Sequence, residues 1–138
     1  MVCTFFGHSF AGSEIRPYLT ECLQDLIENK NATEFLVGNH GNFDAMVWEI
    51  LNLLKAVYPH IVCYKVLAYL PTRSEDGGEN TLFPEGLETV QRKFAIIKRN
   101  EWMINKADTV ITYVKHRTGG AYRFSQIAKK KGKQIIVL

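Results

Sequence analysis

The sequence predicts an α/β protein: a Rossmann-like three-layer sandwich in which helices cover both faces of a mostly parallel, five-stranded sheet. Short runs of β-branched and aromatic residues alternate with helical patterns, and right-handed crossovers arrange such strands in parallel. Glycine-containing loops follow three of these runs. Numbered along the chain, the strands are expected in the order 3-2-1-4-5, which places a ligand crevice at the carboxyl ends of the first and fourth strands.

The first predicted strand is Val2–Phe6, an apolar run bounded by Gly7. A helix is expected over Glu14–Asn29, because apolar residues recur there at helical spacing along one stripe. Pro17 lies in the first turn, where its missing N–H costs little. A single stripe predicts a helix that covers one face of a sheet.

The second predicted strand, Glu34–Val37, leads into a helix over Phe43–Val57. This helix is apolar around most of its circumference, which indicates either deep burial or a subunit interface. Ile61–Leu70 is the third predicted strand.

No regular element is predicted directly after the third strand. Pro71–Glu79 is polar and glycine-rich and is interpreted as a loop, while Thr81–Val90 is apolar in places but without a period. The two segments form either a lid over the ligand site or a long connection. Arg73 could close over a ligand or lie in solvent. A helix is expected next, over Arg92–Lys106.

The fourth predicted strand, Thr109–Val114, is β-branched and aromatic throughout, which suits burial on both faces. A Gly-Gly pair then opens a helix over Ala121–Lys131, and Gly132 suits the position just after its end. Gln134–Leu138 is the fifth predicted strand.

Length, charge and cysteine content narrow the choice of function. The 138 residues suffice for one Rossmann-like domain over residues 1–138. A net charge of +3 does not predict nucleic-acid binding, and Lys129–Lys131 complements a helix dipole. No stretch approaches the ~18 apolar residues of a membrane span. Cys3, Cys22 and Cys63 match no zinc motif, so we interpret them as buried free thiols and expect a cytoplasmic protein.

The loops after three strands should meet at one edge of the sheet. Adjacent glycines at a helix start leave backbone N–H groups accessible, and the helix dipole adds partial positive charge. We therefore predict a pocket for a phosphorylated, nucleotide-like ligand, although short loops between strands and helices also need glycine for tight turns. The predicted ligand-binding residues are Gly7, His8, Gly38, Asn39, Gly41, Asp44, Arg99, Asn100, Gly119 and Gly120.

Several of these side chains also have a purely structural interpretation. His8 could contact a phosphate or ribose, or merely occupy a loop. Asp44 could bind a ribose hydroxyl or act as a base, or stabilise the first turn of its helix by charge alone. Arg99 could pair with phosphate or form a surface ion pair. Metal-ligand spacings, a serine elbow and the common nucleotide-binding glycine motifs are absent, so we predict neither metal nor cofactor. The candidate catalytic carboxylates are Asp44 and Glu49.

Five segments carry a resemblance to a known family: FFGH near the N-terminus, GNHGNFD after the second strand, KRNEWMINKAD, VITYV and GGAYRFSQIAKKKGKQIIVL. Together they resemble the SLOG superfamily over nearly the whole chain, and in particular its small single-domain bacterial members. SLOG proteins are Rossmann-like and include LOG-type cytokinin phosphoribohydrolases and the DprA/Smf group; others are inferred to bind nucleotide-derived signals. The resemblance implies that the crevice is lined by Gly7, His8, Gly38, Gly41, Asp44, Gly119 and Gly120.

One segment departs from the LOG hydrolases. These carry P-G-G-x-G-T-x-x-E, whose Thr and Glu serve phosphate and ribose, whereas residues 118–124 read TGGAYRF. We therefore expect nucleotide binding in a sensor or accessory role. One alternative is hydrolysis of an N-glycosidic bond in a nucleotide-type substrate, with Asp44 or Glu49 stabilising the ribosyl cation. The other is a homodimeric interaction protein with a vestigial pocket, whose interface is the Phe43–Val57 helix.

Overall fold

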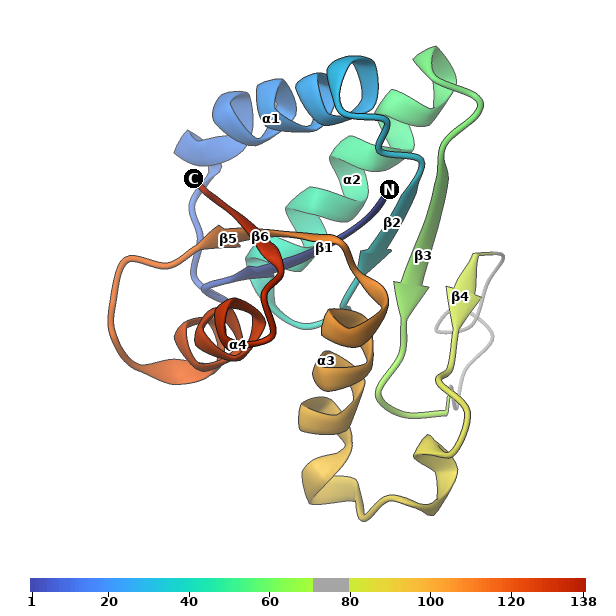
Figure 1. Ribbon diagram of the computed structural model, residues 1–138, viewed down its shortest axis with the longest axis vertical. Coiled ribbons are helices and arrows are strands. Elements are labelled where there is room, and N and C mark those ends of the chain that lie inside the picture. Colours follow the sequence, from blue (N-terminus) through green and yellow to red (C-terminus); the bar gives the residue numbers. More distant parts are fainter. Residues whose placement is uncertain (71–79) are drawn as a thin grey trace.

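The computed structural model describes residues 1–70 and 80–138, so the predicted loop over residues 71–79, including Arg73, lies outside the described residues. In the described part, six parallel strands form one sheet in the order β4-β3-β2-β1-β5-β6 (Figure 1). The strands are β1 (Val2–Gly7), β2 (Glu34–Val37), β3 (Val62–Val66), β4 (Thr81–Leu82), β5 (Thr109–Tyr113) and β6 (Gln134–Val137). The helices are α1 (Arg16–Asn29), α2 (Gly41–Val57), α3 (Ala95–Lys106) and α4 (Gly119–Lys130), with short 3-10 turns at Ser13–Ile15, Leu87–Thr89 and Arg92–Phe94.

The α/β class and the parallel sheet between two helical layers are confirmed, but the predicted count of five strands is wrong. The five expected strands have the expected relative order, and β4 adds a sixth at the edge beside β3. It pairs Thr81 with Lys65 and Leu82 with Val66. Two residues are too few to show the alternation that marks a strand in sequence, so only pairing with β3 reveals it. β3 itself is shorter than the predicted Ile61–Leu70.

Two helices begin at glycines that the sequence placed in the preceding loops. α2 begins at Gly41 and α4 at Gly119, with φ angles of 88° and 89°. In each case the residue before the glycine is extended, so the chain turns sharply into the helix through a backbone conformation that glycine adopts without strain. Both helices therefore start at the edge of the sheet where the strands end.

The core has two layers because neighbouring strand residues point to opposite faces of the sheet. Phe5 and Phe35 stack at 6.2 Å in the layer under α1 and α2. Phe6 stacks on Phe124 of α4 at 5.6 Å in the layer under α3 and α4. Figure 1 shows the two helix pairs on opposite sides of the sheet. Burying each ring contributes about 1.5–3 kcal/mol, so both layers hold the strand ends in place.

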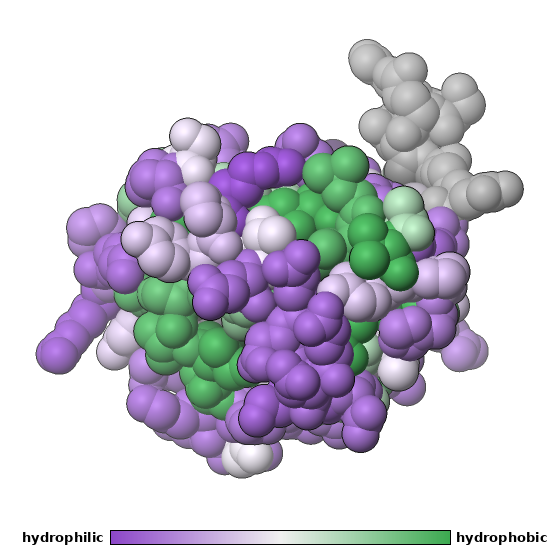
Figure 2. Space-filling view, turned by 90° about the horizontal axis from the view of Figure 1, so that it is seen from above, coloured by the Kyte–Doolittle hydropathy of each residue, from purple (hydrophilic) through white to green (hydrophobic). Residues whose placement is uncertain are grey.

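Some apolar side chains of the two helical patterns lie on the surface. Tyr18 of α1 is 68% exposed, and Leu53 and Val57 of α2 are 62% and 67% exposed. Figure 2 shows a largely hydrophilic face with two separate hydrophobic areas. No helix within residues 1–70 and 80–138 is long and apolar enough to cross a membrane. Cys3 and Cys63 are buried free thiols, as predicted, and Cys22 is half-buried.

Candidate functional site

The ends of β1 and β2 and the start of α4 meet at one edge of the sheet. A Cβ on Gly7 would overlap the ring of Phe43, so glycine at the end of β1 lets α2 pack directly over the strand. A Cβ on Gly38 would lie 2.7 Å from Oδ2 of Asp44 and 3.3 Å from Cζ of Arg99. Glycine at these strand ends therefore makes room for a carboxylate from α2 and a guanidinium from α3.

Arg99 is the central side chain of this region, and it is only 2% exposed. Its Nε donates a hydrogen bond to Oδ1 of Asn100 at 2.7 Å. Its Nη1 donates to Oδ1 of Asn39 at 2.8 Å and to the carbonyl of Val66 at 2.9 Å, and its Nη2 lies 3.2 Å from Nδ1 of His40. All of these partners are neutral acceptors, so the hydrogen bonds orient the guanidinium without neutralising its charge.

Two neighbouring groups titrate abnormally because of this environment. Arg99 always donates, so Nδ1 of His40 accepts, and burial together with the positive charge of Arg99 lowers the pKa of His40. Burial raises the pKa of Asp44 to about 6, although the hydrogen bond from the His40 backbone N–H and the charge of Arg99 act to lower it. The site therefore contains a neutral imidazole and a carboxyl group that titrates close to neutral pH.

A cavity of about 110 Å³ lies against Arg99 and is lined also by Gly7, His40, Asp44 and Gly120. A larger cavity of about 320 Å³ adjoins it and shares Gly7 and Gly120. A Cβ on Gly119 or Gly120 would meet nothing within 4 Å, so the first turn of α4 opens directly into this space. Such backbone is accessible to an anion, as at other helix N-termini.

His8 has a structural role that the sequence did not reveal. Its Nε2 accepts hydrogen bonds from the backbone N–H groups of Lys115 and His116, at 2.7 and 3.3 Å. The ring is therefore neutral, and burial, with a smaller contribution from His116, lowers its pKa. His8 lines the larger cavity, but its Nε2 already accepts hydrogen bonds from the loop after β5.

An aromatic wall, formed by Phe10, His8 and His116, lines the larger cavity. The rings of His8 and Phe10 are nearly parallel, with centroids 4.9 Å apart, and His116 lies 5.8 Å from Phe10. Phe10 is nevertheless 63% exposed. Sequence reasoning did not place Phe10 or His116 at the ligand site. The aromatic residue two positions after His8 was the available signal, because a loop that lines a pocket often presents its aromatic side chains.

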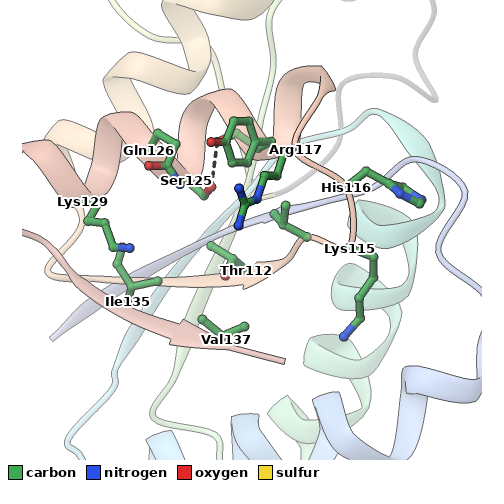
Figure 3. A pocket seen from close by; sticks show the side chains of 11 residues that line it. Thr112, Lys115, His116, Arg117, Ser125, Gln126, Lys129, Ile135 and Val137 are labelled. Carbon is green, nitrogen blue, oxygen red and sulfur yellow. Dashed lines mark hydrogen bonds between the residues drawn. The ribbon is translucent and has the colours of Figure 1, made fainter.

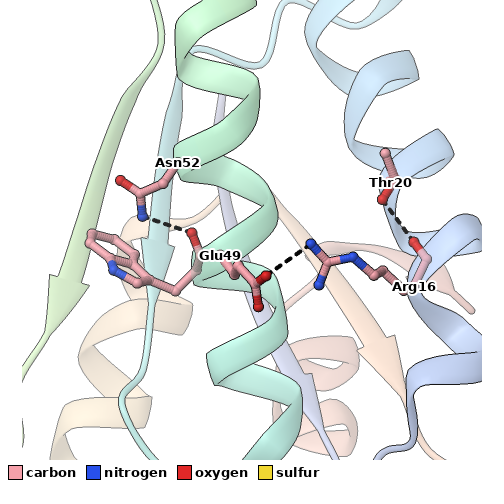
Figure 4. A network of polar contacts seen from close by, with 5 residues as sticks. Arg16, Thr20, Glu49 and Asn52 are labelled. Carbon is pink, nitrogen blue, oxygen red and sulfur yellow. Dashed lines mark hydrogen bonds and ion pairs between the residues drawn. The ribbon is translucent and has the colours of Figure 1, made fainter.

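Most of the predicted ligand-binding residues come together, and two predicted residues lie elsewhere. Asn39 and Asn100 hold Arg99, as described above. Gly41 packs against Ser9, where a Cβ would lie 2.7 Å from its Cα, and it lines neither cavity. Glu49 forms an ion pair with Arg16 of α1 at 3.2 Å, with 65% of its side chain exposed (Figure 4). It lines neither cavity. In the part of the chain that the structure describes, no group of three or more His, Cys, Asp or Glu residues could hold a metal ion.

Comparison with known proteins gives one result that concerns the fold. No family model matches the sequence, and no curated protein matches it. A solved structure, the X-ray structure of DNA processing protein A (DprA) from Streptococcus pneumoniae, superposes with a TM-score of 0.70 at 15% sequence identity. The match covers 98% of this chain and 49% of that one, so this chain spans about half the length of DprA. This chain shares the fold of that half. At such low identity the likeness concerns the fold alone.

Proposed function

We propose that this chain is a SLOG-type protein that binds a nucleotide or nucleotide-derived ligand in the crevice at the ends of β1 and β5, in a sensor or accessory role. One observation carries the proposal: the buried charge of Arg99 is oriented by neutral acceptors and lies against a cavity that also contains the first turn of α4. We also propose a cytoplasmic location, supported by the buried free thiols.

The two adjoining cavities suit different parts of such a ligand. The phosphate is expected near Arg99 and the backbone of Gly119 and Gly120, where both positive charge and N–H donors are available. The base is expected against Phe10 in the larger cavity, because aromatic rings stack on nucleobases with little preference among them.

The test is a thermal-shift and calorimetric screen with AMP, ADP-ribose, NAD and cyclic dinucleotides. A ligand at about 100 times its dissociation constant should stabilise the protein by about 2.7 kcal/mol. Arg99→Gln should abolish the shift. Its matched control is Lys98→Gln on the same helix, a side chain that is 54% exposed and paired with Glu101. A screen without any shift, or one in which both variants behave alike, would contradict the proposal.

Hydrolysis of an N-glycosidic bond is the second candidate function, and Asp44 favours it. Its carboxyl group lies against the same cavity as Arg99 and is ionised above about pH 6, so it could stabilise a developing ribosyl cation. Release of a free base from a bound nucleotide, lost in Asp44→Asn and kept in Glu49→Gln, would establish turnover. A ligand that binds and is recovered intact would leave binding as the function.

We also propose that α2 mediates a homodimer. The helix buries Phe43, Val47 and Leu51 but presents Leu53 and Val57 to solvent. Sedimentation at micromolar concentration should detect a dimer that Leu53→Glu dissociates. Tyr18→Glu, at an equally exposed apolar position on α1, is the matched control. A wild-type monomer would refute the interface.

A further inference from the structure

A separate cavity of about 290 Å³ lies on another face of α4, between that helix and the ends of β5 and β6 (Figure 3). The crevice contacts α4 through Gly120 and Phe124, whereas this cavity contacts it through Ser125 and Lys129. Within residues 1–70 and 80–138, His116 is the one residue that lines both this cavity and the larger part of the crevice. The cavity is therefore a second space, separated from the crevice by α4 and the loop before it.

Two cations point into this cavity. Figure 3 shows the guanidinium of Arg117 and the ammonium of Lys129 directed toward its centre, from the loop after β5 and from α4. Lys115 and His116 point away, and Nζ of Lys115 donates to the carbonyl of Leu138 at 3.3 Å. Among the described residues that line the cavity, none is Asp or Glu. Among the described residues, none forms an ion pair with Arg117 or Lys129.

The sequence around this cavity is basic throughout. Residues 109–138 contain seven of the 17 Lys and Arg residues and none of the 14 Asp and Glu residues. The preceding 108 residues are therefore acidic overall, with ten basic and 14 acidic residues. The net charge of +3 does not reveal this division: the unit β5-α4-β6 carries basic side chains and no acidic ones.

We propose that this cavity is a second anion site, which binds a small ligand carrying two adjacent phosphate groups. Two converging cations without a counter-charge repel each other, and a bound dianion would relieve that repulsion. The planar fork of Arg117 suits bidentate contact with phosphate, and Lys129 adds a point charge from the opposite wall. Ile135 and Val137 provide an apolar wall for the remainder of the ligand. Convergence on one concave site favours a small molecule over a nucleic-acid strand, which would need an extended track.

Pyrophosphate is the probe, titrated calorimetrically into the folded chain. Removing one charge-assisted contact should weaken binding by about tenfold or more, so Arg117→Ala and Lys129→Ala should each do so. Lys130→Ala is the matched control, because Lys130 is the next residue of α4, equally exposed, and does not line the cavity. Amide NMR shifts should change at Thr112 and Ser125 and not at Gly38 and His40.

Three results would overturn the proposal. One is the absence of pyrophosphate binding up to about 10 mM, a concentration that would detect even weak millimolar sites. Another is binding that survives both cavity variants but is lost in Arg99→Gln, because the probe would then occupy the crevice. The third is equal weakening by Lys129→Ala and Lys130→Ala together with displacement by a single-stranded oligonucleotide of about 12 nucleotides, which would indicate a diffuse nucleic-acid surface.

Discussion

The crevice and the cavity between α4 and β6 each contain an arginine, but one arginine is buried and the other is exposed. Arg99 is 2% exposed and is held by Asn39, Asn100 and the carbonyl of Val66. Arg117 is exposed, and its charge is accompanied by that of Lys129 rather than by neutral acceptors. Desolvating a guanidinium costs several kcal/mol, whereas an exposed one keeps its hydration and its rotamer freedom. Arg99 should therefore couple ligand binding to folding, and Arg117 should affect binding alone.

The largest effect expected from this comparison is on stability. Arg99→Leu should lower the free energy of unfolding by about 3 kcal/mol or more, because it removes a buried charge's hydrogen bonds and leaves the buried acceptors Asn100 and Val66 without their donor. Arg117→Ala should stay within about 0.5 kcal/mol of the wild type. Urea denaturation measures both. Equal losses in the two variants would show that the network around Arg99 contributes little to stability.

The next largest effect is the pH dependence of stability that arises from Asp44, the carboxyl group near Arg99. Burial raises the pKa of Asp44 from 3.8 to about 6, so the native state binds this proton more tightly than the unfolded state does. The stabilisation is present at low pH and is lost as pH rises through this window. Relative to Asp44→Asn, the wild type should lose up to about 3 kcal/mol between pH 4 and pH 7. Glu49→Gln, at an exposed position of the same helix, controls for removing a carboxylate. A stability difference independent of pH would show that Asp44 is solvated.

The smallest expected effect is on ligand affinity, and it distinguishes the role of the aromatic wall from that of the phosphate end of the crevice. Phe10→Ala should weaken AMP binding by about 1 kcal/mol or somewhat more, the lower end of a base-stacking contribution, and leave ribose 5-phosphate unaffected. Tyr18→Ala, a similarly exposed aromatic position on α1, is the control. Calorimetry with both ligands measures the difference. Equal weakening for the two ligands would mean that Phe10 shapes the loop rather than holding the base.

Much of the fold could be predicted because the pattern of apolar residues within a long segment indicates which of its faces are buried. The β-branched and aromatic run over Thr109–Val114 and the apolar stripe of α1 each identified an element. β4 could not be predicted, since two residues carry no period and their pairing with β3 depends on residues distant in sequence. The basic character of residues 109–138 was readable from sequence but is hidden in the net charge.

The candidate site was predictable in its backbone and less so in its side chains. Gly7, Gly38 and Gly119 mark strand ends and a helix start, and such positions follow from local sequence. The role of His8 depends on backbone N–H groups more than a hundred residues away, at Lys115 and His116. A loop histidine looks the same in sequence whether it binds a ligand or holds another loop.

The sequence by itself determined the class of fold, the order of its central strands and the glycines at the edge where a ligand would enter, because these follow from local periodicity and backbone freedom. Only the tertiary structure decided that Arg99 is buried among neutral acceptors, that Glu49 pairs with Arg16, and that Phe10 faces the cavity. The physical reason is that burial, hydrogen-bond partners and the resulting pKa of Asp44 depend on which residues meet in space, and those residues come from separate helices and strands.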